Sequence, residues 1–531
     1  MTRRLQDLLT ASAERSPGST ALRLGSASDG GESMTYAELA DTTDRIARVL
    51  TERGVRPGDR VGVLAAKAPW TIAALIGTLK AGGVYVPVDS ASPAPRVARI
   101  VRSAEPTVLL ADATATALID GLVGEGVDDL VVGSLADPLS GARFTSAFAR
   151  ADIAAADASV PAVGERPDLA HLLFTSGSTG EPKGVMITHD MVSAFVDWAL
   201  GHFGTKPGDR ISGHPPLHFD LSTFDIYATL AAGAELHLVP ASLGLDARRT
   251  ASFIRDHELT QWFSVPSVLT YLARFDAVGQ DDFPALERLL WCGEVLPTPV
   301  LAHWMRALPH VRFTNLYGPT EATIASSYHD VPEVPVDESV PVPIGVPCDG
   351  ERLLVLEDGR EAAVGEIGEL YIGGVGLSPG YWRDQEKTDA AFVPGPDGER
   401  IYRTGDLARA DEDGVVHFLG RTDSQIKSRG YRIELGEVES AVNTVAGVRE
   451  CAVVGVDTGG FEGTTICCAY SVVEGRELPV AELRTRVTAL LPRYMLPARW
   501  EELDGLPKNV NGKIDRPALR DRFRPAPKDE T

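Results

Sequence analysis

Residues 172–184 are the segment that most restricts what this chain can fold into. Four hydroxyl side chains alternate with glycines ahead of a single cation, Lys183; the hydroxyls and first glycines are Thr175, Ser176, Gly177, Ser178, Thr179 and Gly180. Glycines let the backbone approach an anion, and successive N–H groups with hydroxyls and a lysine form a concave anion cradle. Apolar residues 172–174 and 185–187 flank the segment, which favours two strands around a loop over a flexible linker. We therefore predict a nucleoside triphosphate site here.

The segment is not a phosphate-binding loop of the Walker type. That loop has the pattern Gly-x-x-x-x-Gly-Lys-Ser/Thr and opens a helix. Here Gly184 and Val185 follow the lysine, and the next residues are strand-like.

Length and charge limit the class of protein. A chain of 531 residues exceeds what one hydrophobic core usually serves, so two or more domains are expected. With 44% hydrophobic and 24% charged residues, the composition is typical of a well-packed enzyme. A net charge of −23 argues against a nucleic-acid partner, which needs a basic surface.

The cysteine pattern and hydropathy point to a cytoplasmic enzyme. The five cysteines show no Cys-x-x-Cys pair, and neither they nor the eleven histidines have zinc-ligand spacing. A reducing cytoplasm is the simplest location. No apolar stretch follows the first residues as in a signal peptide, and no run of about 18 apolar residues predicts a membrane span.

Helix-like and strand-like segments alternate over the first several hundred residues. Helical patterns around residues 39–50 and 72–80 alternate with extended segments at 61–64 and 84–88. This alternation predicts sheets covered by helices on both faces. Residues 149–163 fit a surface connection or an ordinary helix equally well.

The pattern changes near Gly420. A strand is expected at 415–419, followed by an amphipathic helix at 435–445, paired strands at 451–455 and 465–470, and a helix at 480–491. Residues after 420 thus predict a compact α+β unit of about 110 residues, a usual size for one domain.

Four further motifs combine chemically useful side chains. They are Asn-Leu-Tyr-Gly-Pro-Thr-Glu at 315–321, Tyr-Arg-Thr-Gly-Asp at 402–406, Gly-Arg-Thr-Asp at 420–423 before Gln-Ile-Lys-Ser-Arg-Gly-Tyr at 425–431, and Asn-Val-Asn-Gly-Lys-Ile-Asp at 509–515. Each alone is a weak signal, because Tyr-Gly-Pro-Thr also makes a plain turn and Gly-Lys a hairpin tip.

In this order and at these separations, the motifs resemble the adenylate-forming superfamily, and more narrowly the amino-acid adenylation domains of non-ribosomal peptide synthesis. The segments at 34–39, 79–89 and 368–374 extend the resemblance over nearly the whole chain. It implies an α/β fold with a large N-terminal domain of βα-type subdomains with helix-covered sheets plus a β-barrel-like part. A small mobile α+β C-terminal domain follows. The implied boundaries are 1–420 for the adenylation core, 421–424 for a hinge and 425–531 for the mobile lid.

The family's reaction has two halves. A carboxylate attacks the α-phosphorus of ATP to give an acyl-adenylate and pyrophosphate, and a carrier-protein phosphopantetheine thiol then attacks the adenylate. Alignment and stabilisation of charge on the phosphoryl oxygens provide most of the catalysis.

The resemblance assigns roles to residues of this chain. ATP would be held by Thr175, Ser176, Gly177, Ser178, Thr179, Gly180, Lys183, Asn315, Tyr317, Gly318, Asp406 and Arg421. Within that set Tyr317 would lie against adenine with Asn315 near its edge, while Asp406 would bind the ribose, helped by Arg421.

Catalysis would fall to three further residues. Thr320 would bind the α-phosphate, Glu321 would hold Mg²⁺, and Lys513 would bridge the substrate carboxylate and the forming adenylate. Asp423 matches the hinge. Rotation there would withdraw Lys513 and bring residues 429–431 to the thiol tunnel.

Asp220 distinguishes amino acids from other acids. It stands where amino-acid-activating members place the aspartate that pairs with the α-ammonium, and acyl- and aryl-CoA ligases of the superfamily lack it. A buried carboxylate needs such a cation, although a helix N-cap is the competing interpretation.

The aligned pocket is apolar between two charged ends. It would consist of Asp220, Leu221, Phe224, Phe263, Leu290, Cys292, Leu316, Ile324 and Ala325, closed by Lys513. No lining side chain there satisfies a polar substrate side chain, so we expect an amino acid of the size of alanine, aminobutyrate, valine or proline. Cys292 has no histidine partner by motif and is expected to line the pocket.

Two subfamilies resemble this pattern, the D-alanyl and the prolyl carrier-protein ligases. The chain departs from the former at Phe224, Phe263 and Leu316, which are bulkier or more apolar than expected there. No carrier-protein motif follows residue 519, so we expect a free-standing enzyme of antibiotic or other natural-product biosynthesis that loads a separate peptidyl carrier protein. The rival interpretations are an acyl- or aryl-CoA ligase and a non-catalytic scaffold; the intact motifs argue against the latter.

Overall fold

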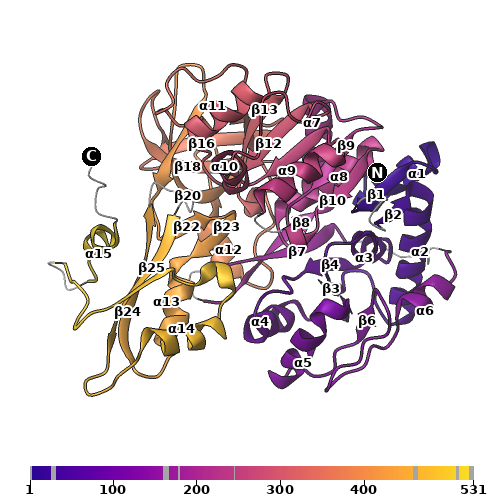
Figure 1. Ribbon diagram of the computed structural model, residues 1–531, viewed down its shortest axis with the longest axis horizontal. Coiled ribbons are helices and arrows are strands. Elements are labelled where there is room, and N and C mark those ends of the chain that lie inside the picture. The colour runs from indigo at the N-terminus through magenta and orange to yellow at the C-terminus, as the bar shows by residue number, and fades with distance from the viewer. Residues whose placement is uncertain are drawn as a thin grey trace.

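The computed structural model describes residues 3–25, 31–159, 167–177, 180–243, 246–457, 464–509 and 513–524. The mixed α/β chain has a large N-terminal domain and a small C-terminal domain beside it, drawn in orange to yellow in Figure 1. Among the described residues, no helix has the length and apolar character that crossing a membrane requires.

A six-stranded sheet forms the first subdomain and carries the residue 172–184 segment. Its strands pair in parallel except for the last pair, in the order β6 (Val132–Ser134), β5 (Val108–Ala111), β3 (Arg60–Leu64), β4 (Val84–Pro87), β7 (Leu169–Thr175) and β8 (Lys183–Thr188). The helices of this part of the chain are α3 (Pro69–Lys80), α4 (Ala94–Ala104), α5 (Thr116–Gly124) and α6 (Arg150–Ala155). The strands at 61–64 and 84–88 and the helix at 72–80 are thereby confirmed.

A nine-stranded sheet forms the second subdomain. Its order is β15 (Val346–Pro347), β14 (Ser327–Val331), β13 (Arg312–Tyr317), β12 (Arg288–Cys292), β11 (Gln261–Ser264), β9 (Arg210–Gly213), β10 (Glu235–Leu238), β1 (Thr20–Leu24) and β2 (Glu32–Thr35). The helices of these chain segments are α1 (Leu5–Arg15), α2 (Tyr36–Glu52), α7 (His189–Phe203), α8 (Asp220–Ala232), α9 (Ala247–Asp256), α10 (Pro266–Arg274) and α11 (Thr298–Ala307). Because β12 and β13 run parallel, their carboxyl ends deliver Cys292 and Tyr317 to one edge of the sheet.

A smaller antiparallel sheet takes the place of the part expected to be barrel-like. Its strands are β17 (Arg360–Glu361), β16 (Glu351–Glu357), β18 (Gly368–Gly374), β20 (Arg400–Ala410) and β19 (Phe392–Pro394), with β21 (Val416–Arg421) also paired to β20. Helix α12 (Gln385–Ala391) precedes β19.

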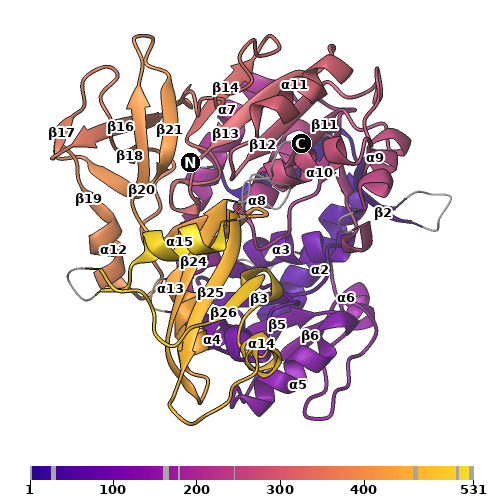
Figure 2. The same cartoon turned by 60° about the vertical axis from the view of Figure 1, so that its left-hand side comes forward.

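The small domain combines a hairpin with a three-stranded sheet. The hairpin is β22 (Gln425–Ser428) and β23 (Tyr431–Glu434), and the sheet is β24 (Val448–Asp457), β25 (Thr464–Val472) and β26 (Arg499–Glu502). Its helices are α13 (Leu435–Asn443), α14 (Val480–Thr488) and α15 (Arg516–Phe523). Figure 2 shows this domain in front of the large one, close to α4 and α12.

Two local expectations are refined. Residues 150–155 are helical, which decides between the two interpretations of the 149–163 stretch for that part, while residues 160–166 lie outside the described residues. Helix α14 ends at Thr488 rather than at residue 491. Pro492 explains the early end, because the residue before a proline is disfavoured in the α conformation.

Candidate active site

The predicted phosphate loop joins β7 to β8. Thr175 and Lys183 are partners across the two strands, so the loop begins and ends at one place. A Cβ on Gly177 would lie 2.1 Å from the Glu181 carbonyl oxygen, and Gly180 has φ +84° and donates its N–H to the Gly177 carbonyl at 3.0 Å. Both positions therefore require glycine. Ser178 and Thr179 lie outside the described residues.

Lys183 lies beside the Glu321 carboxylate that follows β13. Its ammonium is 5.0 Å from the centre of the Tyr381 ring, and the Tyr381 hydroxyl donates to Glu321 at 2.8 Å. Burial and the neighbouring Arg432 cation lower the pKa of Lys183. Lys183 of the loop and Glu321, the predicted metal ligand, thus both contact Tyr381.

Glu321 is completely buried and is held as an anion. It lies in the short 3₁₀ helix Thr320–Ala322, and Arg432 of β23 donates to its second oxygen at 2.5 Å. Burial alone would raise the pKa of Glu321, but Arg432 and Lys183 overcome this effect and lower it to about 2. Within the described stretches, no three His, Cys, Asp or Glu side chains gather as a metal cluster.

Tyr317 and Asp406 form the next part of the site. The Tyr317 hydroxyl and the Arg421 guanidinium donate to the two oxygens of Asp406, and Arg421 is the cross-strand partner of Asp406. The Lys427 ammonium lies 5.6 Å from the centre of the Tyr317 ring. Asn315 donates its side-chain amide to the Pro343 carbonyl at 2.8 Å. Tyr317, Asp406 and Arg421 therefore form one hydrogen-bonded group, while Asn315 is held separately by the Pro343 carbonyl.

The turn after Tyr317 has no room for a side chain. A Cβ on Gly318 would lie 2.7 Å from the Cα of Ala325. Thr323 and Ile324 take left-handed φ values of 56° and 67°. This conformation is strained for β-branched residues, and such strain often marks functional sites. The chain here folds back tightly against the predicted pocket.

Asp220 is buried at the start of α8, and its carboxylate faces Thr320. The Thr320 hydroxyl donates to its carboxylate at 2.7 Å, and the N-cap position is held by Phe219. Burial raises the pKa of Asp220 to about 6, although the Thr320 hydrogen bond opposes the shift. The N-cap interpretation of Asp220 is therefore wrong.

The apolar residues assigned to the substrate pocket are brought together in one cluster. Its predicted members are Leu221, Phe224, Phe263, Leu290, Cys292, Leu316, Ile324 and Ala325, all buried. The cluster also contains residues that sequence reasoning missed, namely Phe195, Trp198, Ala199, Phe203, Ala228 and Cys348. Phe195 and Trp198 had a helical-spacing signal on α7, but any core-facing helix gives the same signal.

Phe224 fills the middle of this cluster. Its ring lies edge-on to Phe195 and Phe263, with ring centres 5.3 and 5.5 Å apart. Cys292 directs its sulfur toward the Ile324 carbonyl at 3.9 Å, and burial raises the pKa of its thiol to about 12. A thiol so far from ionisation is a poor nucleophile.

The small domain contacts the site through the β22–β23 hairpin. Besides the Arg432–Glu321 ion pair, the Ser176 hydroxyl donates to the Arg432 carbonyl at 2.7 Å and Arg432 donates to the Tyr402 hydroxyl at 3.2 Å. A buried ion pair between Arg96 of α4 and Glu437 of α13 adds a second link between the domains. Sequence reasoning missed Arg432, although it directly follows the 425–431 motif.

Lys513 does not close the pocket in this structure. Its side chain is exposed, and its N–H donates to the Asn509 side chain at 3.0 Å, within the hairpin that leads to α15 on the outer side of the small domain (Figure 1). The expectation of a lysine-closed pocket is corrected for this orientation. The reason is geometric, since the domain presents β22–β23 to the site and turns the Lys513 hairpin away from it.

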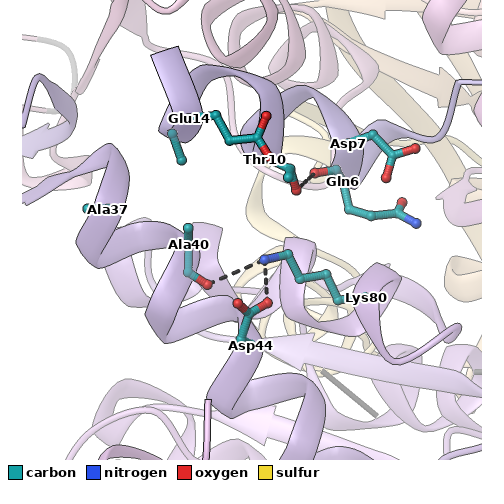
Figure 3. A pocket seen from close by; sticks show the side chains of 9 residues that line it. Gln6, Asp7, Thr10, Glu14, Ala37, Ala40, Asp44 and Lys80 are labelled. Atoms are coloured by element: carbon teal, nitrogen blue, oxygen red, sulfur yellow. Dashed lines mark hydrogen bonds and ion pairs between the residues drawn. The ribbon is translucent and has the colours of Figure 1, made fainter. Parts of the chain in front are cut away.

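A separate hollow of about 420 Å³ lies between α1, α2 and α3 (Figure 3), and none of the active-site residues lines it. Lys80 lines it and is paired with Asp44 at 2.5 Å and with the Ala40 carbonyl at 3.3 Å. Its cation is therefore already neutralised.

The chain matches two family models. Residues 9–382 match the AMP-binding enzyme model, and residues 437–513 match the model of the AMP-binding enzyme C-terminal domain. The chain belongs to the AMP-binding enzyme family. It is thus a ligase of the adenylate-forming superfamily, as its motifs predicted.

Curated relatives of this AMP-binding enzyme include two L-proline–[L-prolyl-carrier protein] ligases. The one from Streptomyces coelicolor is 38% identical over 92% of this chain and 91% of its own length, and the one from Pseudomonas fluorescens is 36% identical over 92% and 94%. Among solved structures, the Vibrio cholerae adenylation domain AlmE in complex with glycyl-adenosine-5'-phosphate superposes with a TM-score of 0.84 at 25% identity, covering 98% of this chain and 97% of that one. These comparisons do not favour the acyl-CoA ligase alternative.

Proposed function

We propose that this enzyme uses ATP to convert a small or medium apolar amino acid to its aminoacyl-adenylate and then transfers the aminoacyl group to the phosphopantetheine thiol of a carrier protein. The observation that carries the proposal is Asp220, a buried carboxylate at the edge of an otherwise apolar cluster. A cationic group of the substrate would balance that charge, and an apolar side chain suits the rest. Among alanine, aminobutyrate, valine and proline, the two prolyl-carrier ligase relatives favour proline.

The residues for the first half-reaction follow from the site. The loop of residues 176–183 receives the outer phosphates, Asp406 with Tyr317 receives the nucleoside, and Thr320 lies between these regions and Asp220. Mg²⁺ fits Glu321, an ionised carboxylate beside the loop, because this ion prefers few carboxylates together with phosphate oxygens. Bound there, it supplies charge neutralisation to the phosphates.

The orientation of the small domain suits the second half-reaction. Lys513 is turned away, whereas residues 430–432 lie against Glu294, Phe219 and Glu321. We place the hinge at residues 421–424, between a core of 1–420 and a mobile part of 425–531. Asp423 supports this placement, since it accepts from Arg421 at 2.8 Å and from the Gln425 N–H at 3.0 Å.

The five cysteines are free and buried, which supports a reducing cytoplasm.

The test is amino-acid-dependent ATP–pyrophosphate exchange with L- and D-alanine, aminobutyrate, valine, proline, β-alanine and several acids that lack an amine. We expect strong exchange with one apolar α-amino acid. Exchange only with acids that lack an amine would overturn the role of Asp220 and establish an acyl-CoA ligase instead.

A further inference from the structure

Glu294 joins the two domains through a single carboxylate. It follows β12, and its two oxygens accept N–H groups from different parts of the chain: Ser267 of α10 at 3.2 Å and Gly430 of the small domain at 2.8 Å. Gly430 lies in the turn of the β22–β23 hairpin that reaches the active site. One side chain of the core therefore contacts the loop that must move.

The contact to Ser267 fixes this side chain on the core. Helix α10 begins at Pro266, and its N-cap residue, Val265, supplies no side-chain acceptor. The first amides of a helix lack partners within the helix, and an acceptor from outside satisfies them. Glu294 meets this need with one oxygen and keeps the other directed at the hairpin.

The turn of the β22–β23 hairpin packs closely against the core beside Glu294. Gly430 has φ +80°, and a Cβ there would lie 2.6 Å from a methyl carbon of Val265, so only glycine fits. The neighbouring Tyr431 ring lies 5.1 Å from the Phe219 ring and stacks on Tyr494 at 3.6 Å. Glu294 provides a hydrogen-bond acceptor for the hairpin beside these apolar and aromatic contacts.

We propose that Glu294 is a positioning residue for thiol transfer, holding the hairpin against the core through Gly430 during the second half-reaction. The inference rests on the proposed function in assuming two half-reactions. When Lys513 enters the site, the hairpin leaves and Glu294 loses one partner but keeps Ser267. Hydrogen bonds to a carboxylate are stronger than those between neutral groups, so Glu294 favours the orientation in which both are made.

The experiment compares Glu294→Gln with the wild-type enzyme and with Glu333→Gln, an exposed glutamate of the large domain, as control. The two N–H groups are bound to different oxygens of Glu294, so in glutamine the donor NH₂ would face one of them and that hydrogen bond would be lost. We expect ATP–pyrophosphate exchange within about twofold of wild type, and transfer of aminoacyl-adenylate to free pantetheine slowed by at least about tenfold.

A second readout follows the small domain without any substrate. Dyes on Phe275→Cys and Val473→Cys report the distance between the domains by energy transfer; both positions are about half exposed, while the five native cysteines are buried. We expect Glu294→Gln to reduce the population with the orientation seen here. Unchanged transfer together with an unchanged distance distribution would overturn the proposal.

Equal losses in both half-reactions together with a lower melting temperature would also overturn it, since they would make Glu294 only a cap for α10. If none of the amino acids supported ATP–pyrophosphate exchange by the wild-type enzyme, the proposed function would fail. The energy-transfer comparison would still test the role of Glu294.

Discussion

The Arg432 guanidinium donates to the Glu321 carboxylate at 2.5 Å, across the boundary between the two domains. Glu321 is the residue that we propose as the Mg²⁺ ligand of the first half-reaction, and the small domain brings a cation of its own to the same carboxylate. A buried carboxylate without a cation is costly, and Arg432 supplies one in the orientation in which Lys513 is absent. Under the proposed domain rotation, Arg432 and Lys513 would thus bring different positive charges to one site.

Replacement of Arg432 should separate the half-reactions. In Arg432→Met the docked hairpin no longer brings a guanidinium to Glu321, which keeps Lys183 beside it. We therefore expect thiol transfer to slow by about tenfold or more while pyrophosphate exchange changes by less than about threefold. Parallel exchange and single-turnover transfer assays measure both. Arg484→Met, on an exposed face of α14, is the control and should change neither rate. A larger loss in exchange than in transfer would contradict the assignment.

Lys513→Ala should give the opposite pattern. Loss of the mobile charge should slow adenylate formation by roughly 10²–10³-fold and leave transfer from preformed aminoacyl-adenylate near the wild-type rate. Lys508→Ala, a lysine of the same hairpin that pairs with Glu450 at 2.5 Å, should leave exchange unchanged. Adenylate formation by Lys513→Ala at the wild-type rate would show that another group carries this charge.

Asp220 should trade stability for function. Because burial raises its pKa from 3.8 to about 6, the folded chain holds this proton more tightly than the unfolded chain. The contribution of Asp220 to stability therefore falls as the pH rises through this range, and it stays low above pH 6. The variant Asp220→Asn can still accept from Thr320. Its free energy of unfolding at pH 8 should be roughly 1–3 kcal/mol higher than that of the wild type. Urea unfolding at pH 8 and pH 5.5 measures this, with a smaller difference at the lower pH.

Asp220→Asn should also remove amino-acid-dependent exchange, because the α-ammonium loses its counter-ion.

In the wild-type enzyme, the KM for the amino acid should rise up to about tenfold per pH unit below pH 6, as Asp220 becomes protonated. The KM for ATP, measured in parallel, serves as control. A pH-independent KM for the amino acid would rule out Asp220 as its partner.

Cys292 should prove dispensable for chemistry. Its thiol pKa of about 12 and its burial predict no reaction with iodoacetamide at pH 8. Cys292→Ala should carry out both half-reactions, with a change mainly in the KM for the amino acid because the pocket becomes larger. Mass spectrometry and the two assays test this, and loss of transfer alone would indicate covalent catalysis.

Much of the site could be predicted because its residues lie in contiguous motifs. The strand–loop–strand at 172–184 was visible from its apolar flanks, and the apolar residues assigned to the pocket do form one cluster. Phe195 and Trp198 could not be assigned to that cluster, because a helical apolar face does not reveal which core it joins. The contacts of Glu294 and Arg432 across the domain boundary could not be predicted for a related reason. Their partners, Gly430 and Glu321, lie more than 100 residues away along the chain.

The sequence by itself determined the secondary structure, the family and the chemistry of the phosphate loop, because glycine, hydroxyl and charged residues at fixed spacing restrict the local backbone. Only the tertiary structure decided which of these two segments of the small domain faces the active site. Lys513 and Arg432 both belong to the small domain, and both carry a charge that suits Glu321 or its surroundings. Local sequence cannot rank two docked orientations of one domain, because their energies depend on contacts such as Glu294–Gly430 and Arg432–Glu321, which exist only after the domains have packed.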